Sequence, residues 1–263
     1  MNGIDISHHN FKNITTSDIK KHDFVIMKAT EGKFFIDPRI NYYYNTIHGR
    51  NDGKPDCYKQ YGFYHFARPE NNTAISEAKN FLNVVKAHSG YALFALDWEG
   101  EALKYSPSWA LRWCDYVYDR TGTKPVVYIQ SAELKKSKYD KLFKKYGLWV
   151  AHWGVNEPKT YGKKYTIWQK GILNGIDYNV FNGNRYNWNK LVGRQKEVIN
   201  NIHVNDYVRV LTRVDYNGVL NDKWVLNSVF RVCQIKGERV VISRNNLVTG
   251  AWHINDLKLA NVK

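Results

Sequence analysis

Apolar runs and amphipathic stretches alternate along the chain up to residue 146. Each apolar run has the length of a buried strand, and the runs fall at residues 3–7, 24–29, 61–66, 91–96 and 125–129. Apolar residues at helical spacing predict helices over about 37–49, 73–88, 106–120 and 131–146. Pro107 in a first turn and Gly122 after a last turn mark the limits of one of them. Strands and helices in alternation predict a parallel sheet.

The rhythm changes after residue 147. Three further strands, at 148–151, 165–168 and 176–177, follow with no helical pattern between them. Eight strands within about 180 residues, most of them in strand–helix units, predict an α/β fold. The predicted architecture is an incomplete TIM-like (β/α)5β3 barrel over residues 1–183.

The composition shifts again beyond Gly183. Residues 184–203 are polar and basic, and we predict a linker there with room for a short helix. From Val204 onward the pattern is one of short alternating runs, separated by turns at Asn217-Gly218 and Lys236-Gly237. Residues 204–263 are therefore predicted to form a small all-β barrel as a second domain.

Asp97 and Glu99 follow the buried run at 91–96 and are the first candidates for chemistry. Residues two apart in extended backbone point to the same side, so both carboxylates are expected to face one pocket. Cleavage of a glycosidic bond needs such a set, with one acid protonated and others ionised. An acidic loop after a core strand is the plainer interpretation, and this stretch alone favours it.

Two further acids change that balance. Asp5 lies in the first strand between two isoleucines, and Asp177 lies at the end of the last predicted strand. In barrels of parallel strands, active residues gather at the carboxyl ends of the strands. Acids paired within the core would need basic partners, and only Lys28 and Arg68 are placed to serve. The four acids together therefore favour an acidic pocket.

Composition narrows the class of protein. The 263 residues carry a formal charge of +15, which favours polyanions such as nucleic acid, anionic membrane or anionic wall polymer without choosing among them. A hydrophobic content of 43% excludes a disordered chain. Cys57, Cys114 and Cys233 lie far apart with no Cys-x-x-Cys spacing, which argues against structural zinc and a disulfide framework. No metal or other cofactor is expected.

The first residues lead straight into a strand, without a basic and then apolar leader. No run of 18 apolar residues occurs, so no membrane insertion is expected. We expect synthesis in the cytoplasm without a signal peptide. If the target lies outside the cell, another component must release the protein.

Five short motifs follow one another in the first 183 residues: Gly3–Ser7, Lys28–Gly32, Gly62–Phe66, Leu96–Glu99 and Gly175–Phe181. Each is weak alone, but in this order they resemble the N-acetylmuramidases, or lysozymes, of glycoside hydrolase family 25. The resemblance implies an incomplete β/α barrel. It also implies cleavage of the β-1,4 bond between N-acetylmuramic acid and N-acetylglucosamine in peptidoglycan.

The resemblance also implies roles. Glu99 is expected to be the general acid, and Asp97 to orient the substrate's 2-acetamido group, whose carbonyl oxygen would attack the anomeric carbon with retention. A direct nucleophile at Asp97 or Asp177 is the alternative. Asp5 and Asp177 are expected to hold the charge and hydrogen bonds of the pocket. Substrate contacts are expected from Tyr64, Trp153, Gln169 and Lys28.

These four contacts have plainer alternatives. Tyr64 and Trp153 suit a core or rim position equally well, and Gln169 could merely satisfy strand backbone. Lys28 could instead pair with one of the carboxylates, which is a structural role within the site.

The run Val248–Leu257 resembles, more weakly, a bacterial SH3-like wall-binding domain. Trp224 and Trp252 would either bind wall polymer there or form the domain's core. A catalytic domain joined to such a domain, without a signal peptide, is similar to a phage endolysin. A holin would then release it from the host cytoplasm, and peptidoglycan and anionic wall polymers would be its partners.

Two rival functions stay open. One is a non-catalytic protein that binds wall glycan with the same barrel. The other is nucleic-acid binding through basic and aromatic surface, for which the sequence carries no recognised motif.

Overall fold

The computed structural model describes residues 1–48, 59–193 and 202–260. It divides into two compact units, Met1–Arg194 and Gln195–Lys263. The border falls inside the predicted linker 184–203, of which residues 194–201 lie outside the described part, as does Cys57. Within the described residues, no helix is long and apolar enough to cross a bilayer.

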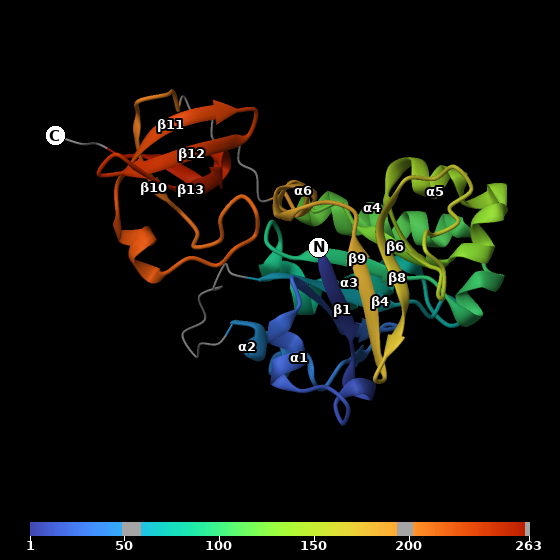
Figure 1. The fold of residues 1–263 in the computed structure, drawn as a ribbon. Helices are drawn as coiled ribbons and strands as arrows, with labels where there is room; N and C mark the ends of the chain where they lie inside the picture. The colour runs from blue at the N-terminus through green and yellow to red at the C-terminus, as the bar shows by residue number, and fades with distance from the viewer. Residues whose placement is uncertain (49–58, 194–201, 261–263) are drawn as a thin grey trace. The chain divides into compact units, whose positions relative to one another are not determined.

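The sheet of the first unit closes into a barrel (Figure 1). Because β1 (Asn2–Ile6) also pairs in parallel with β2 (Phe24–Glu31), eight strands form a ring, and β3 (Phe35–Ile36) adds an edge beside β2. The predicted α/β fold is confirmed as a closed, barrel-like sheet. In ring order the strands are β1 (Asn2–Ile6), β9 (Ile176–Phe181), β8 (Tyr165–Leu173), β7 (Gly147–Ala151), β6 (Val126–Gln130), β5 (Leu93–Asp97), β4 (Gln60–Phe66) and β2 (Phe24–Glu31).

One barrel strand runs against the other seven. β9 is antiparallel to both of its neighbours, whereas the remaining pairs in the ring are parallel. The prediction that Asp177 ends the last strand is therefore wrong, because it is the second residue of β9. Since β9 is reversed, its first residues lie where the other strands end, and Asp177 pairs with Asp5 of β1.

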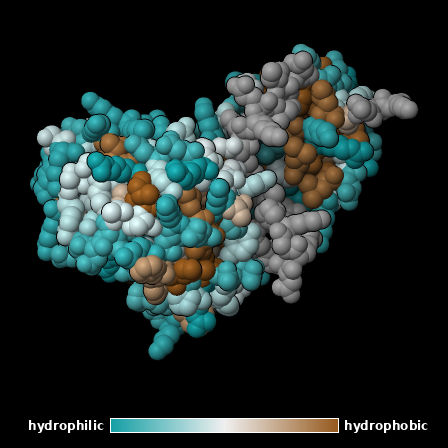
Figure 2. All heavy atoms as spheres, turned by 180° about the vertical axis from the view of Figure 1, so that it is seen from behind, coloured by the Kyte–Doolittle hydropathy of each residue, from teal (hydrophilic) through white to brown (hydrophobic). Residues whose placement is uncertain are grey.

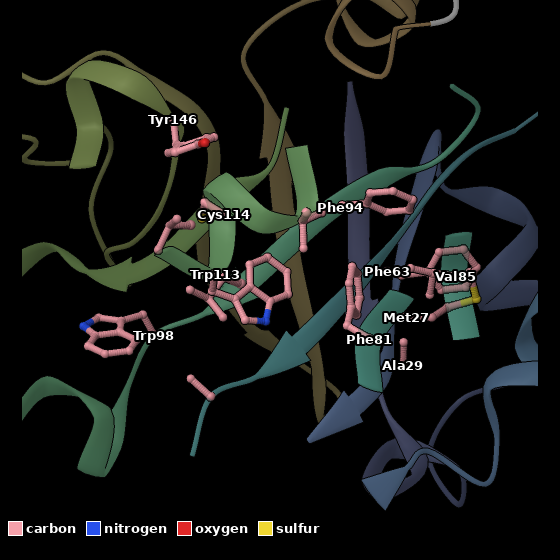
Figure 3. Close-up of a cluster of buried hydrophobic side chains, with 14 of the residues drawn as sticks. Met27, Ala29, Phe63, Phe81, Val85, Phe94, Trp98, Trp113, Cys114 and Tyr146 are labelled. Carbon is pink, nitrogen blue, oxygen red and sulfur yellow. The ribbon is translucent and has the colours of Figure 1, made fainter. Parts of the chain in front are cut away.

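Helices pack around the outside of the barrel (Figure 1). In the outer core that they cover, the Phe81 ring of α3 (Ala74–Val85) lies 5.5 Å from Phe94 of β5 and 5.1 Å from Trp113 of α4 (Pro107–Thr121) (Figure 3). α4 has the predicted limits, with Pro107 in its first turn and Gly122 at φ +67° after its end. The helices are α1 (Thr16–Lys21), α2 (Ile40–His48), α3 (Ala74–Val85), α4 (Pro107–Thr121), α5 (Asp140–Lys145) and α6 (Arg185–Leu191).

The segment 131–146 is not the single helix that we predicted. Two 3₁₀ helices, Ser131–Lys135 and Ser137–Tyr139, precede the short α5. The buried residues Leu134 and Tyr139 are five positions apart, so a continuous α-helix would place them on different faces. The extended backbone of Lys136 interrupts the helical turns between them, so that both side chains reach the core. α1 and β3 were not predicted, because six and two residues are too few to show a period.

The interior of the barrel has an apolar layer and a polar layer. Side chains two apart on a strand point to the same face, so Phe24 and Ile26 of β2 lie below Lys28. Trp188 of α6 packs at the apolar end, with its ring 5.0 Å from Phe24 and 5.1 Å from Phe181. The apolar layer comprises Phe24, Ile26, Leu93, Ala95, Val126, Ile167, Phe181 and Trp188. The polar layer comprises Asp5, Lys28, Tyr64, Asp97, Tyr128, Gln169 and Asn179.

The second unit is a separate antiparallel sheet, which confirms its predicted all-β character. Trp252 is fully buried and donates from Nε1 to the Thr212 carbonyl at 3.0 Å, so it belongs to the core, whereas Trp224 is 43% exposed. Figure 2 shows apolar side chains gathered on one face of this unit. In sheet order its strands are β13 (Leu247–His253), β12 (Arg239–Arg244), β11 (Phe230–Lys236), β10 (Tyr207–Val210) and β14 (Leu257–Leu259).

Candidate active site

A cavity of about 370 Å³ opens above the polar layer, at the mouth of the barrel. It is lined by all eight residues predicted for the site, namely Asp5, Lys28, Tyr64, Asp97, Glu99, Trp153, Gln169 and Asp177. The other residues of its wall are Ser7, His9, Glu31, Phe66, Arg68, Tyr128 and Trp149. The closed barrel thus brings together side chains that lie up to 172 positions apart in the sequence.

Two side-chain amides hold Asp5. Its neighbours Ile4 and Ile6 are buried in the outer core, so the alternation of the strand turns the Asp5 carboxyl into the barrel. Asn179 Nδ2 donates to Asp5 Oδ2 at 2.7 Å, and Gln169 Nε2 donates to the same oxygen at 3.0 Å. Burial, Asp177 and Glu99 raise the pKa of Asp5 to about 7, although the two amide bonds oppose the rise.

Three aromatic side chains fix the orientation of these amides. Gln169 Oε1 accepts hydrogen bonds from the Tyr128 hydroxyl at 2.9 Å and from Trp153 Nε1 at 3.0 Å. Asn179 Oδ1 accepts one from Trp149 Nε1 at 2.8 Å. Because N–H and O–H donors occupy each amide oxygen, each amide nitrogen must face the buried carboxyl group of Asp5. The polar layer is therefore a set of side chains that hold one another in place.

Glu31 binds the two cations that line the cavity. Lys28 Nζ lies 2.6 Å from Glu31 Oε2, and Arg68 donates from Nε to Oε1 at 2.7 Å. A bulge in the β2–β4 pairing between Lys28 and Thr30 shifts the alternation, so that residues three apart meet on one side. Burial raises the pKa of Glu31, but the bonds from Lys28 and Arg68 outweigh it and hold that pKa below its usual value. Lys28 therefore pairs with a carboxylate of the cavity wall, and this carboxylate is Glu31 and not one of the four predicted acids.

Asp97 has a buried carboxyl oxygen, Oδ1, that no hydrogen bond compensates among the described residues. Burial, Glu99 and Asp5 raise its pKa well above the usual value, and Lys28 opposes the rise. A buried acceptor without a partner is unfavourable, so Asp97 is poised to accept a hydrogen bond from a bound molecule.

Glu99 and Asp177 complete the acidic group. Burial and Asp177 raise the pKa of Glu99, while Lys28 lowers it in part. Burial also raises the pKa of Asp177. Carboxyl groups crowded in one partly dry site cannot all ionise together, so some keep their protons near neutral pH. The arrangement can therefore donate a proton from one acid while another carries negative charge.

A buried network supports the site from the outer core. His65 lies between Thr30 and Glu77, with its ring nitrogens 2.7 Å from Thr30 Oγ1 and 2.7 Å from Glu77 Oε2. Glu77 Oε2 also accepts from the backbone N–H of Arg68 at 3.0 Å. His65 thereby helps to fix the backbone of the arginine that holds Glu31. Among the described residues, no group of His, Cys, Asp and Glu side chains is arranged to hold a metal ion.

Sequence reasoning missed the parts of the site that depend on pairing between strands. Tyr128, Trp149 and Asn179 were not predicted as site residues. A signal for two of them was present, since Asn179 lies two residues after Asp177 and Tyr128 lies two after the buried Val126. Glu31 as the partner of Lys28 had no such signal, because the bulge that joins them follows from the contact with β4.

A β/α barrel with several protonatable carboxyl groups at its mouth is an arrangement that glycoside hydrolases use. Residues 4–171 match the sequence model of the glycosyl hydrolases family 25, and the chain belongs to this family. The resemblance that we inferred from five motifs is thereby confirmed at the level of the family.

Three known proteins show how far the similarity extends. The uncharacterized protein YegX of Escherichia coli O6:H1 is 30% identical over 170 residues, which cover 61% of this chain and 59% of that protein. The chain thus spans less than two thirds of the length of this relative. The bacterial lysozyme from Streptomyces coelicolor is 26% identical with a TM-score of 0.60, over 73% of this chain and 97% of that one. The CTP1L endolysin is 26% identical with a TM-score of 0.54, over 72% and 69%.

Proposed function

We propose that this protein is a peptidoglycan hydrolase that cleaves the β-1,4 bond between N-acetylmuramic acid and N-acetylglucosamine. The observation that carries the proposal is the group of four acids at the barrel mouth, where burial and mutual repulsion keep protons on some carboxyls. Membership of family 25 and the similarity to a bacterial lysozyme support the choice of substrate.

Glu99 acts as the general acid. It lies at the mouth of the cavity, and burial together with Asp177 raises its pKa, so that it keeps a proton to give to the departing sugar oxygen. Lys28 limits this rise in the pKa of Glu99. Its ammonium group bonds to Glu31, however, and forms no direct ion pair with Glu99 among the described residues. Asp177 and Asp5 hold the negative charge that stabilises the cationic sugar in the transition state.

Asp97 orients the 2-acetamido group of the substrate. Its buried Oδ1 has no hydrogen-bond partner among the described residues, and an amide N–H would supply one. The acetamido oxygen would then attack the anomeric carbon from the face opposite the leaving group, and water would open the resulting ring with net retention. This route needs no covalent bond to the protein. A covalent adduct on Asp97 or Asp177 would instead establish the direct nucleophile.

The remaining wall residues bind sugar. Trp153 is 49% exposed at the rim, and its Nε1 is tied to Gln169, so its indole face is held ready for a sugar ring. Tyr64 lies deeper, beside Asp5 and Asp97, and burial followed by these two charges raises its pKa well above the usual value. It is therefore a neutral hydroxyl that can donate to the substrate.

The test compares two glutamates that lie two positions apart. Glu99→Gln keeps the shape of the general acid but removes its proton, and reducing ends from purified peptidoglycan should appear about 1,000-fold more slowly. The matched control is Glu101→Gln, since Glu101 is exposed, pairs with Lys104 and lies outside the cavity. Mass spectrometry of the fragments should show N-acetylmuramic acid at the new reducing end. A folded Glu99→Gln protein with wild-type activity would exclude this role, and wall binding without release of reducing ends would favour the non-catalytic alternative.

The second unit is proposed to bind the wall. It is a small basic β unit with half-exposed Trp224, whose ring lies 5.4 Å from the Arg244 guanidinium. We infer that it is SH3-like and binds peptidoglycan or an anionic wall polymer. With the similarity to an endolysin, this supports a role in phage lysis, in which a holin releases the protein from the host cytoplasm. Retention of the isolated unit 202–263 on purified walls would test this part.

A further inference from the structure

A second cavity, of about 520 Å³, adjoins the catalytic one. The two cavities share Tyr128 and Trp153 in their walls, so they adjoin each other. We refer to it as the lysine cavity. It lies where β6 and β7 end, and its other lining residues are Gln130, Ser131, Ala132, Lys135, Ala151, His152, Lys159 and Tyr161.

The two cavities differ in charge. Five carboxyl groups line the catalytic cavity, whereas the lysine cavity is lined by Lys135 and Lys159 and by no acidic residue. Neither ammonium group has a carboxylate partner among the described residues, although Lys135 Nζ lies 5.9 Å from the centre of the Tyr161 ring. Two unpaired cations in one concave wall attract an anion, and the aromatic faces of Trp153 and Tyr161 suit a partly apolar one.

The wall of the lysine cavity is tied together across the sequence. Ser131 Oγ donates to the Lys159 carbonyl at 2.6 Å, and the Lys159 backbone N–H donates to His152 Nδ1 at 2.9 Å. Trp168 Nε1 donates to the His152 carbonyl at 2.8 Å. Tyr161 has a left-handed backbone at φ +52°, a conformation that is unfavourable outside glycine and persists only where its surroundings impose it. The cavity is therefore shaped before any ligand arrives.

We propose that the lysine cavity binds the free carboxylates of the peptide branch carried by N-acetylmuramic acid. The inference rests on the proposed function, because that branch is attached to the sugar whose bond is cut. The acidic cavity favours the ring on which positive charge develops, and the adjoining basic cavity favours the anionic peptide of the same residue. Because Tyr128 and Trp153 line both cavities, the place for the sugar ring and the place for its peptide adjoin each other.

The experiment measures kcat/KM on two substrates. One is peptidoglycan glycan with its peptides intact and free of other wall polymers, and the other is the same glycan after removal of the peptides. We expect the wild-type protein to favour the peptide-bearing glycan. A Lys135→Met and Lys159→Met double variant should reduce the ratio of the two kcat/KM values by about fivefold to tenfold, as expected for the loss of two partly exposed ion pairs.

The control removes two other lysines from the same region. Lys141 and Lys144 are exposed on α5 and do not line the cavity, so a Lys141→Met and Lys144→Met variant loses the same charge but should keep the wild-type ratio. Equal kcat/KM on both glycans, or a wild-type ratio in the Lys135 and Lys159 variant, would overturn this inference but not the proposed function. Absence of cleavage of either glycan by the wild-type protein would instead overturn the proposed function.

Discussion

The apolar and polar layers of the barrel are built by the same strands and differ by a step of two residues. On β5, Ala95 is fully buried among apolar side chains, and Asp97 is the next residue on that face. On β8, Ile167 and Gln169 stand in the same relation. The apolar layer supplies close packing, whereas the polar layer places several acids where ionisation is unfavourable. Close packing in the apolar layer thus offsets the unfavourable burial of acids in the polar layer.

The largest expected effect breaks the apolar layer. Trp188→Ala removes a fully buried indole that packs on Phe24 and Phe181 and should lower the free energy of unfolding by about 3–5 kcal/mol. Urea denaturation measures this change, and Trp153→Ala, at the exposed rim, serves as the control for stability. The folded fraction of the Trp188 variant should keep most of its activity, because Trp188 belongs to the apolar layer and is not among the residues that line the cavity. A loss of specific activity in proportion to the loss of stability would show that the layers are not separable.

The second prediction concerns the polar layer, where a substitution should lower activity and raise stability. Asp97→Asn should slow the release of reducing ends about 100-fold, because a neutral amide accepts the hydrogen bond of the 2-acetamido N–H less strongly than a carboxylate does. At neutral pH its free energy of unfolding should rise, because folding no longer buries a carboxyl whose pKa is raised by burial and by Glu99. Activity and denaturation measured on the same preparation test both halves. An Asp97→Asn protein that is both active and less stable would contradict the interpretation of Asp97 as a strained catalytic group.

The third prediction concerns pH. A carboxyl with a higher pKa in the folded than in the unfolded chain binds protons on folding, so stability falls as the pH rises between the two values. For Asp5 this interval runs from about 4 in the unfolded chain to about 7 in the folded one. Denaturation at several pH values should show the fall, and Asp5→Asn should reduce its slope by up to about 1.4 kcal/mol per pH unit. A slope unaffected by this variant would contradict the titration of Asp5 in this interval.

The smallest expected effect tests the side chains that hold Asp5. Gln169→Leu removes one of the two amide donors to Asp5 Oδ2, and these bonds favour the ionised form. The pKa of Asp5 should therefore rise further above about 7, as measured by carbon NMR of the labelled carboxyl. Gln169→Asn, which keeps the amide on a shorter side chain, should give a smaller change. A titration of Asp5 at its wild-type position in the leucine variant would show that the donor is not needed.

The fold and the acids of the site were predictable where they depend on local alternation. Asp5 could be placed in the pocket because Ile4 and Ile6 occupy the opposite face of the strand. The direction of β9 could not be predicted, since a period of two reads the same in either direction. Asp177 therefore reaches the correct end of the barrel for a different reason from the one expected.

Other features depend on contacts that no local pattern carries. The pairing of Lys28 with Glu31 requires the bulge against β4, and a regular strand would place these residues on opposite faces. The break at Lys136 depends on how Leu134 and Tyr139 reach the core from one segment. The roles of the individual acids remain predictions that the variants described above are designed to test.

The reversed strand also determines where the catalytic unit begins and ends in space. Because β9 runs beside β1 in the opposite direction, the Met1 amino group lies 3.2 Å from the carbonyl oxygens of both Phe181 and Gly183. A peptide of a few residues can therefore join these points, and the unit is suited to circular permutation with new ends opened in a surface loop.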